Sequence, residues 1–266
     1  MDNEKKETTE KKMETLDDYE VIIKKIQLQE LIDSFNNTVG HLKGKNCPIC
    51  KNKGVVRVYE NGRLLDKECS CMKERRENLR FEASGLAGRL TKNTFKTFQA
   101  NEYWQQKVKD TAINSMYNGD GFFIGGKCGS GKTHICIAIV QDFLARGVNC
   151  KYVGWQELAT SLKQNEYGNS DEYVETMTAI KTAPVLFLDD LFRTNVTDAD
   201  RRLLFSIIDY RYNEVESGKN LFTVFSSEKF LDEIVKIDEG IGRRVARLAR
   251  GYTLNVPREE KYKYRG

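Results

Sequence analysis

The apolar pattern of the chain first becomes regular after residue 16, where apolar side chains recur every three or four positions. The residues of this stripe are Tyr19, Ile22, Ile23, Ile26, Leu28, Leu31, Ile32 and Phe35. The spacing is that of one helix face, and we expect the helix to end near Asn36 and Asn37. A stripe that faces the core of a small domain is the ordinary interpretation, and the alternative is a face offered to a partner helix.

A second pattern lies at residues 54–65, where apolar and polar residues alternate around Asn61-Gly62. Alternation is typical of a half-buried strand, and Asn-Gly is a preferred sequence for the two-residue turn between antiparallel strands. The segment therefore predicts a β-hairpin.

From residue 101 onward, strand-like and helix-like patterns follow one another. The predicted strands are 122–126, 149–153, 185–189 and 220–227, and the predicted helices are 101–116, 132–146, 157–163, 197–211 and 240–250. The runs rich in β-branched and aromatic residues lack alternation, which is typical of parallel strands buried on both faces. The fold class predicted is α/β, with a central parallel sheet flanked by helices.

The strand at 122–126 leads through a glycine-rich loop into a helix. Gly126, four further residues and then Gly131-Lys132-Thr133 have the P-loop spacing, in which backbone N–H groups surround a phosphate at a helix N-terminus. Lys132 is placed to reach the β- and γ-phosphates of ATP, and the Thr133 hydroxyl to hold Mg²⁺. The alternative is a glycine turn between core elements, but the flanking strand and helix favour the P-loop.

The residues predicted to bind the nucleotide are Gly126, Gly129, Ser130, Gly131, Lys132, Thr133 and His134. His134 is included by its position, although it is most simply a helix residue. Lys132 is also counted as catalytic, because its charge lies where negative charge develops during phosphoryl transfer.

Two acidic residues, Asp189 and Asp190, close the apolar run that begins at Val185. The carboxyl end of a strand is where an open α/β sheet places its ligand. Asp189 is therefore the predicted Mg²⁺ partner, acting through water, and Asp190 is predicted to orient or deprotonate the attacking water. The alternative is a solvated turn. The next strand ends in Ser226-Ser227-Glu228, any of which is a candidate to sense the γ-phosphate.

Residues 240–250 concentrate four arginines on one short predicted helix. By itself this segment is a solvated basic face or a phosphate-binding patch. Because it follows the acidic pair and the polar strand end, it suggests arginines presented to the ATP of a neighbouring subunit. We therefore expect self-association through the ATPase domain.

Two cysteine pairs, Cys47-Pro-Ile-Cys50 and Cys69-Ser-Cys71, flank the predicted hairpin. The hairpin brings the pairs together, and four thiolates are a structural ligand set for tetrahedral Zn²⁺. The alternatives are four unrelated buried thiols, or His41 in place of one thiolate. A domain of about 70 residues has a marginal core, so we expect zinc to contribute to its folding.

Length and composition divide the chain further. Its 266 residues suffice for one α/β core and a smaller unit, and Ser84-Gly85 with Gly88 indicates a hinge. The first residues are almost all polar, which is typical of disorder. We expect a disordered tail at 1–14, a zinc-binding domain at 15–75, a basic linker at 76–100 and an ATPase domain at 101–266.

Charge and hydropathy limit the location and the partners. The net charge is +4, but residues 1–20 hold eight acidic and four basic residues, so the remainder carries +8. Such a charge is compatible with a nucleic-acid partner or with a solvated surface. No apolar run approaches the roughly 18 residues of a membrane span, and the start does not read as a signal peptide. We expect a cytoplasmic protein without a membrane partner, and seven cysteines that form no disulfide framework.

Five segments together carry a family resemblance. They are Gly-Lys-Cys-Gly-Ser-Gly-Lys-Thr-His at 126–134, Leu-Phe-Leu-Asp-Asp-Leu-Phe at 186–192, Ile-Ile-Asp-Tyr-Arg-Tyr at 207–212, Phe-Ser-Ser-Glu-Lys at 225–229 and Ile-Gly-Arg-Arg-Val at 241–245. With the paired cysteines and Ser-Gly-Leu before them, they resemble the DnaC/DnaI family of replicative helicase loaders, especially phage-encoded forms. The resemblance covers roughly residues 40–256.

This resemblance implies an AAA+ ATPase domain behind a zinc-bearing domain that engages a hexameric DnaB-type helicase. The helicase would be placed on single-stranded DNA in a bacterial cytoplasm. The resemblance also implies that Arg244 is the arginine finger, with Arg247 as the second choice. The chain departs from many AAA+ proteins at the sensor position, where it has Ser-Ser-Glu instead of Asn.

Two other functions compete with the loader: an IstB-type transposition helper ATPase and a P-loop small-molecule kinase. IstB-like proteins generally lack the cysteine pairs, and a kinase has no use for an arginine supplied by a neighbour. For the loader, we expect single-stranded DNA to contact basic and aromatic residues such as Tyr152, Trp155 and Lys163. The alternative for these aromatic residues is a place in the core.

Overall fold

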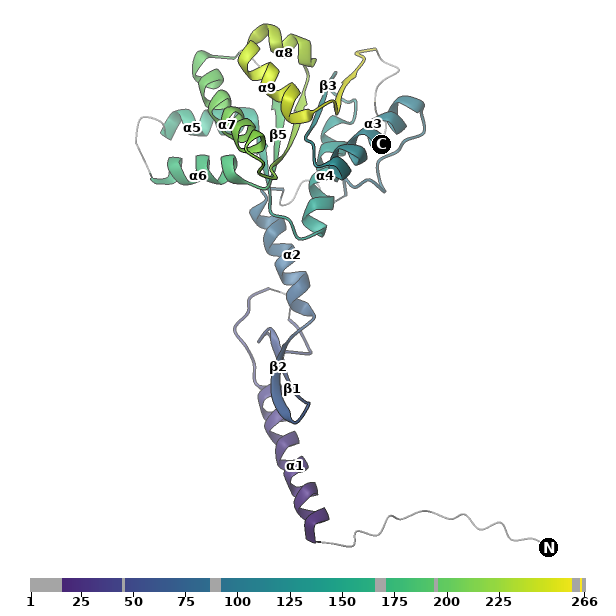
Figure 1. Cartoon of the computed structure of the whole chain (residues 1–266), viewed down its shortest axis with the longest axis vertical. Helices are drawn as coiled ribbons and strands as arrows, with labels where there is room; N and C mark the ends of the chain where they lie inside the picture. The colour runs from purple at the N-terminus through teal and green to yellow at the C-terminus, as the bar shows by residue number, and fades with distance from the viewer. Residues whose placement is uncertain are drawn as a thin grey trace, which may run out of the picture. The chain divides into compact units, whose positions relative to one another are not determined.

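The computed structural model describes residues 16–44, 46–86, 92–165, 171–193, 196–259 and 264 (Figure 1). The side chains at 16–18 and 163–165 are outside this description. The chain forms two compact units, residues 1–76 and 77–266. The tail predicted at 1–14 lies outside the described residues.

The first unit contains helix α1 (Leu16–Asn37), strands β1 (Val55–Glu60) and β2 (Arg63–Glu68), and the start of α2 (Cys71–Ala83). The strands pair antiparallel, with Glu60 opposite Arg63. Asn61 and Gly62 form the turn with φ of 50° and 78°, the positive values that a type I′ turn requires. The predicted hairpin is confirmed.

Helix α1 is attached to the hairpin through its last turn. The Asn36 side chain donates to the Arg57 carbonyl and accepts from the Arg57 amide at 2.9 and 2.8 Å, and the Arg57 guanidinium lies over the Phe35 ring. Most of the stripe ahead of this contact is exposed, with Ile23 and Ile26 more than half accessible. The core-facing interpretation is therefore wrong for most of the stripe within this unit. No helix of the described residues is long and apolar enough to cross a membrane.

The second unit is built on a five-stranded parallel sheet with strand order β4-β5-β6-β3-β7. Its strands are β3 (Phe122–Gly126), β4 (Cys150–Gly154), β5 (Val185–Leu191), β6 (Phe222–Ser227) and β7 (Thr253–Val256). Its helices after α2 are α3 (Tyr103–Asn118), α4 (Lys132–Ala145), α5 (Trp155–Asn165), α6 (Asp171–Thr182), α7 (Asp198–Glu216), α8 (Leu231–Ile237) and α9 (Glu239–Ala249). The predicted parallel α/β sheet is confirmed, while α6, α8 and β7 were not expected.

Two apolar layers cover the faces of the sheet, with α3 and α4 on one side and α5, α6, α7 and α9 on the other (Figure 1). Side chains of β3, β5 and β6 contribute to both layers, so these three strands are buried throughout, apart from the half-buried Asp190. All strands run in the same direction, so the carboxyl ends of β3, β5 and β6 meet at one edge. Polar residues at those ends are thereby brought together.

The stretch expected to be a linker contributes to the second unit. The Tyr152 amide of edge strand β4 donates to the Ser84 carbonyl at 2.7 Å. Leu86 and Phe98 are buried in the layer beneath α3 and α4. These contacts cover the β4 edge of the sheet. They also attach the segment that precedes α3 to the second unit.

A fully buried arginine fixes the edge of the sheet opposite the polar strand ends. Arg211 of α7 donates to the hydroxyl of Thr223 and to the carbonyls of Lys181, Ala183 and Phe222 at 2.7 to 3.0 Å. Burial lowers the pKa of the guanidinium to about 9. The side chain therefore connects the end of α6 with the starts of β5 and β6.

We expect Arg211→Ala to lower the free energy of unfolding by about 3 to 5 kcal/mol, because two buried carbonyls and one half-buried carbonyl lose their donor. Denaturant titration of the whole chain measures this change. Arg202→Ala, an exposed position on the same helix, is the matched control and should change stability by less than about 0.5 kcal/mol. Equal effects of the two substitutions would contradict the role given to Arg211.

Candidate functional site

The loop between β3 and α4 has the glycine geometry that a phosphate cradle needs. Gly126, Gly129 and Gly131 have φ of 155°, 82° and 80°, a region that other residues rarely adopt. A Cβ on Gly126 would lie 2.8 Å from the Val256 carbonyl oxygen, and one on Gly131 would lie 2.9 Å from the Tyr264 ring. The loop therefore tolerates only glycine at these positions, and it leads directly into the N-terminus of α4.

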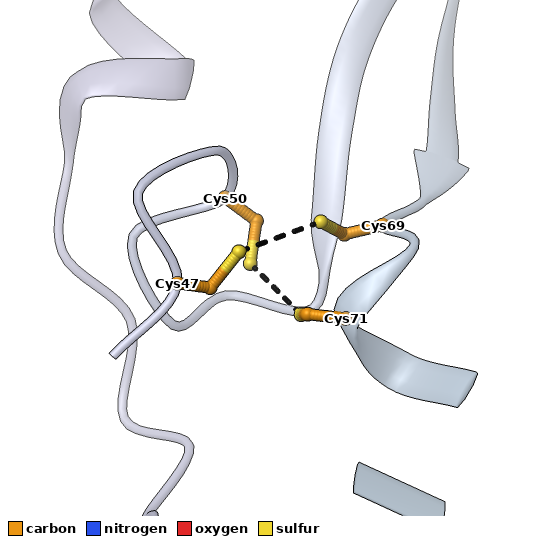
Figure 2. Close-up of side chains that lie close together, drawn as sticks. All are labelled: Cys47, Cys50, Cys69 and Cys71. Carbon is orange, nitrogen blue, oxygen red and sulfur yellow. Dashed lines mark hydrogen bonds between the residues drawn. The ribbon is translucent and has the colours of Figure 1, made fainter. Parts of the chain in front are cut away.

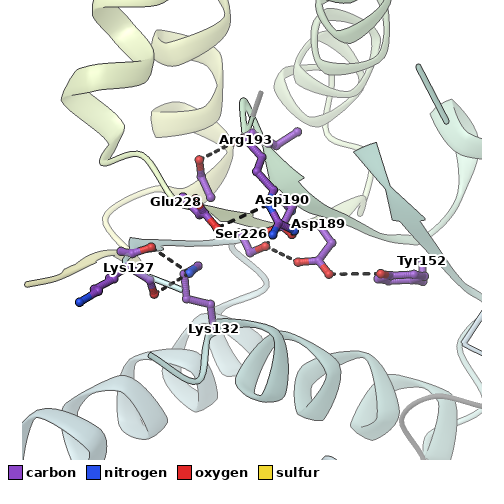
Figure 3. A network of polar contacts seen from close by, with 11 residues as sticks. Lys127, Lys132, Tyr152, Asp189, Asp190, Arg193, Ser226 and Glu228 are labelled. Atoms are coloured by element: carbon purple, nitrogen blue, oxygen red, sulfur yellow. Dashed lines mark hydrogen bonds and ion pairs between the residues drawn. The ribbon is translucent and has the colours of Figure 1, made fainter. Parts of the chain in front are cut away.

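Lys132 and Ser130 provide polar groups inside the loop. The Lys132 ammonium is buried and donates to the carbonyls of Gly126 and Lys127 at 2.8 and 3.0 Å (Figure 3). Burial lowers its pKa, while the charges of Asp190 and Glu228 act in the opposite direction. Within the described residues, the buried Ser130 hydroxyl has no hydrogen-bond partner. A buried ammonium and an unpaired hydroxyl in a glycine loop fit a bound phosphate group.

The buried carboxylate of Asp189 lies at the end of β5, between β4 and β6. The hydroxyl of Ser226 donates to its Oδ1, and the hydroxyl of Tyr152 donates to its Oδ2 at 3.2 Å (Figure 3). Burial raises the pKa of Asp189, and the hydrogen bond from Ser226 partly opposes this shift. Both oxygens are held in fixed directions, so Asp189 is suited to ordering the water around a cation.

Asp190 lies on an irregularity of the same strand. The pairing of β5 with β6 shifts register between Leu188 and Leu191, and Asp190 has a positive φ of 56°. The Asp190 amide donates to the Ser226 hydroxyl at 3.0 Å. The bulge separates the directions of two adjacent carboxylates, as different roles for them require.

The candidates for the sensor position differ in their contacts. The Ser226 hydroxyl already serves Asp189 and the Asp190 amide. The Ser227 hydroxyl is buried, donates to the Leu191 carbonyl at 2.5 Å and accepts from the Lys229 amide at 3.0 Å. Glu228 is half-buried and lies 3.6 Å from the guanidinium of Arg193. Sequence reasoning gave Arg193 no role, and no motif marks it.

The ring of His134 faces an aromatic group that sequence reasoning also missed. Its Nε2 is 3.2 Å from the Thr94 carbonyl, and the ring lies edge-on to Phe98 and Tyr264. Tyr264 stacks on Phe98 and donates its amide to the Gly129 carbonyl at 2.7 Å. His134 therefore attaches residues 94–98 to the helix that follows the loop, and burial lowers its pKa.

Arg244 is held against α7. Its Nε donates to Asp209 at 2.7 Å, and its guanidinium lies over the rings of Phe205 and Tyr212. The side chain of Arg247 is exposed and, among the described residues, has no hydrogen bond or ion pair. None of the described contacts of Arg244 is to the loop at 126–133 or to β5.

Two of the residues suggested for DNA contact lie in the interior. Trp155 is 4% exposed and belongs to the core layer of α5 to α9. Tyr152 is half-buried, with its hydroxyl on Asp189 and its ring against Phe187. The side chain of Lys163 lies outside the described residues. The core interpretation is confirmed for Trp155, which is not available for stacking on a base.

The four cysteines of the first unit form one cluster. Figure 2 shows the sulfur atoms of Cys47, Cys50, Cys69 and Cys71 pointing toward one another, all within 4.8 Å. Cys47 and Cys69 are 3.8 Å apart, and Cys50 and Cys71 are 3.5 Å apart. A tetrahedron of sulfurs at about 2.3 Å from an ion has edges of about 3.8 Å. The four thiols fit such a site.

Local hydrogen bonds prepare the cluster to hold a cation. The Gly54 amide donates to the sulfur of Cys50 at 3.3 Å, and the hairpin holds Cys69 through the Gly54 carbonyl. Burial raises the pKa of the Cys50 thiol, but the Gly54 amide and the other cysteines outweigh it and lower the pKa to about 6. Burial raises the pKa of Cys71 to about 12. A lowered pKa at Cys50 favours the thiolate form that a metal ion binds.

Comparisons with known proteins agree with this architecture. The sequence model of the family described as IstB-like ATP binding protein matches residues 21–236. The phage-like element PBSX protein XkdC of Bacillus subtilis (strain 168) is 29% identical over 79% of this chain and 82% of its own length. The replicative helicase loader DnaI of the same strain is 24% identical over 84% of this chain and 75% of its own.

A solved structure has the same fold as the second unit. The crystal structure of the DnaC helicase loader superposes with a TM-score of 0.52 at 22% identity, over 65% of this chain and all of that chain. The predicted AAA+ fold class is confirmed.

We expect one Zn²⁺ per chain, because the four sulfurs converge at distances that fit a tetrahedral zinc site. Elemental analysis of the purified protein measures it. A Cys47→Ser/Cys50→Ser double variant should lose the zinc, and Cys128→Ser, outside the cluster, should retain it. Full zinc content in the double variant, or a folded first unit without metal, would contradict this site.

Proposed function

The chain belongs to the family of IstB-like ATP binding proteins, and from this membership, its fold and its site we propose its function. We propose that it is an ATP-dependent loader that places a hexameric DnaB-type replicative helicase on single-stranded DNA. The observation that carries the ATPase part is the convergence of Lys132, Asp189 and Asp190 at one edge of the sheet. The similarity to the replicative helicase loader DnaI supports the proposed loading of a helicase.

Each residue of the site has a separate role in the proposed hydrolysis. The loop amides and Lys132 bind and orient the β- and γ-phosphates. Thr133 and Asp189 would hold Mg²⁺, which supplies charge neutralisation between those phosphates. Asp190 accepts the proton of the attacking water and orients it. The bulge that separates the two carboxylates supports this division.

The first unit is the proposed contact with the helicase. Its cysteine cluster would hold Zn²⁺ and fix the hairpin, to which the last turn of α1 is attached through Phe35 and Asn36. The exposed stripe of α1 has the spacing of a helix-binding face, and a face of this kind is stable in water when a partner covers it. We propose that the partner is a helical segment of the helicase.

Single-stranded DNA is the proposed second partner, bound by the ATPase unit. The positive charge of residues 21–266 supports it, and affinity that falls steeply with salt is the expected signature. The family description also supports a second candidate, a transposition helper of the IstB type. The cysteine cluster favours the loader, because a transposition helper of the IstB type is expected to lack it.

We expect Lys132→Ala and Asp190→Asn to separate binding from hydrolysis. Lys132→Ala should weaken ATP binding by about 10- to 150-fold, the effect of a lost charge-assisted hydrogen bond. Asp190→Asn should bind ATP and hydrolyse it about 10²- to 10⁴-fold more slowly, because only the base is removed. Nucleotide titration and phosphate release measure the two effects, and equal loss of binding in both variants would contradict these roles.

We propose that Arg244 completes the ATP site of a neighbouring subunit. Arg244→Ala should leave ATP affinity nearly unchanged and reduce hydrolysis by about two orders of magnitude or more. Asp209→Asn is the matched control, because it breaks the same ion pair with α7 but keeps the arginine. This control should retain most hydrolysis.

Mixing variants tests the position of the arginine. Chains with Arg244→Ala and chains with Lys132→Ala should recover activity together, because an intact arginine then meets an intact loop across a subunit boundary. No recovery in mixtures that assemble, or equal loss in Asp209→Asn, would assign Arg244 to the fold of its own chain.

A further inference from the structure

Arg193 is the exposed cation beside the proposed catalytic carboxylate. Its Nη1 donates to Asp190 Oδ2 at 2.9 Å, and its Nε lies 3.6 Å from Glu228 (Figure 3). The guanidinium is half accessible, whereas Asp190 and Glu228 are about one-third accessible. One arginine thus connects the end of β5 with the residue that follows β6.

The two carboxylates are shared between two cations. Asp190 and Glu228 both act on the charge of buried Lys132, and the same two groups raise the pKa of Arg193. In Figure 3 the two carboxylates lie between Arg193 and Lys132. A terminal phosphate next to Lys132 would bring further negative charge to this pair of acids. A guanidinium is a favourable partner for that charge, because it binds phosphate oxygens bidentately.

The backbone around Arg193 is held in an unusual conformation. Asp190 and Phe192 both have positive φ, 56° and 57°, although neither is glycine. The Asp190 amide is held by Ser226, the Leu191 carbonyl by Ser227, and the Phe192 side chain is 1% exposed in the core. The segment from 190 to 192 is therefore fixed by its neighbours, and the exposed side chain of Arg193 leaves a rigid base. Strain of this kind concentrates at ligand sites.

We propose that Arg193 is the residue that distinguishes ATP from ADP: it pairs with Asp190 when no terminal phosphate is bound and exchanges that carboxylate for the γ-phosphate when one is. This inference rests on the proposed ATPase function. The exchange frees the carboxylate of Asp190 for water only when ATP occupies the site. The hydroxyls of Ser226 and Ser227 are engaged in other hydrogen bonds. Arg193 therefore takes the role of sensing the γ-phosphate in their place.

The test is the affinity of the full-length protein for two probes, ADP and a non-hydrolysable ATP analogue, each with Mg²⁺. Arg193→Ala should weaken binding of the ATP analogue about tenfold or more and leave binding of ADP unchanged. Glu228→Gln should tighten binding of the analogue about two- to fivefold, because one competing carboxylate is removed, and only when Arg193 is present. Arg146→Ala, which breaks an exposed ion pair with Asp142 on α4, is the matched control and should change neither affinity.

The Asp190→Asn background separates direct contact from charge repulsion. If Arg193 contacts the γ-phosphate, Arg193→Ala still weakens binding of the ATP analogue in this background. If the substitution acts only by exposing the charge of Asp190, the effect disappears there, and the proposal is overturned. Equal losses for ADP and the analogue would also overturn it. A wild-type protein that binds neither probe would refute the proposed function itself, whereas wild-type binding with an unaffected Arg193→Ala variant would refute this inference alone.

Discussion

The buried carboxylate of Asp189 is the contact on which the functional edge of the sheet depends. It accepts hydrogen bonds from Tyr152 on β4 and Ser226 on β6, so one side chain connects three neighbouring strands. Burial raises its pKa, which means that the ionised form costs folding free energy above the ordinary carboxyl pKa, a cost that is relieved as the pH falls. A carboxylate whose pKa is raised by folding does not stabilise the fold by its charge. This direction is consistent with the proposed role of Asp189 in binding a cation.

The rest of the site is arranged around this carboxylate. Ser226 also fixes the Asp190 amide, so the bulge of β5 and the direction of the second carboxylate follow from the same hydroxyl. Asp190 and Glu228 in turn lie near Lys132 of the loop and Arg193 beyond the strand. Phosphate binding, cation binding and water activation are thus proposed for groups that are linked by hydrogen bonds and charge.

Local sequence patterns were sufficient where one element determines its own structure. The Asn61-Gly62 turn, the glycine loop before Lys132 and the apolar run of β5 each have a short-range signature, and the structure contains all three elements. Strand β7 has no such signature, because its four residues are ordered by pairing with β3, more than 120 residues earlier. The contacts of Arg193 and Tyr264 likewise depend on tertiary neighbours. Helix α6 buries only Met177 and Ile180 completely, which is too few apolar positions for a clear helical period.

Helix α1 is a case in which the sequence predicted the element but not its surroundings. The helix was predicted correctly, and α1 spans Leu16–Asn37, but the predicted single face is wrong. The two-residue step from Ile26 to Leu28 places the apolar residues before it and after it on opposite sides of the helix, and periodicity alone does not say what covers either side. Within its unit, α1 is fixed to the hairpin by Phe35 and Asn36, and most of its earlier apolar residues, including Ile23 and Ile26, stay exposed. A partner for this face is the simplest physical explanation, since water does not stabilise it. The proposed loader function supplies such a partner in the replicative helicase.

Size-exclusion chromatography of the purified chain with the DnaB-type replicative helicase of the same cell, in the presence of ATP and Mg²⁺, tests the proposed loader function most directly. We expect the two proteins to co-elute. A chain with Ile23→Asp and Ile26→Asp, both exposed positions, should elute separately while its zinc and its ATP binding are retained. Separate elution of the wild-type chain and the helicase would contradict the loader function.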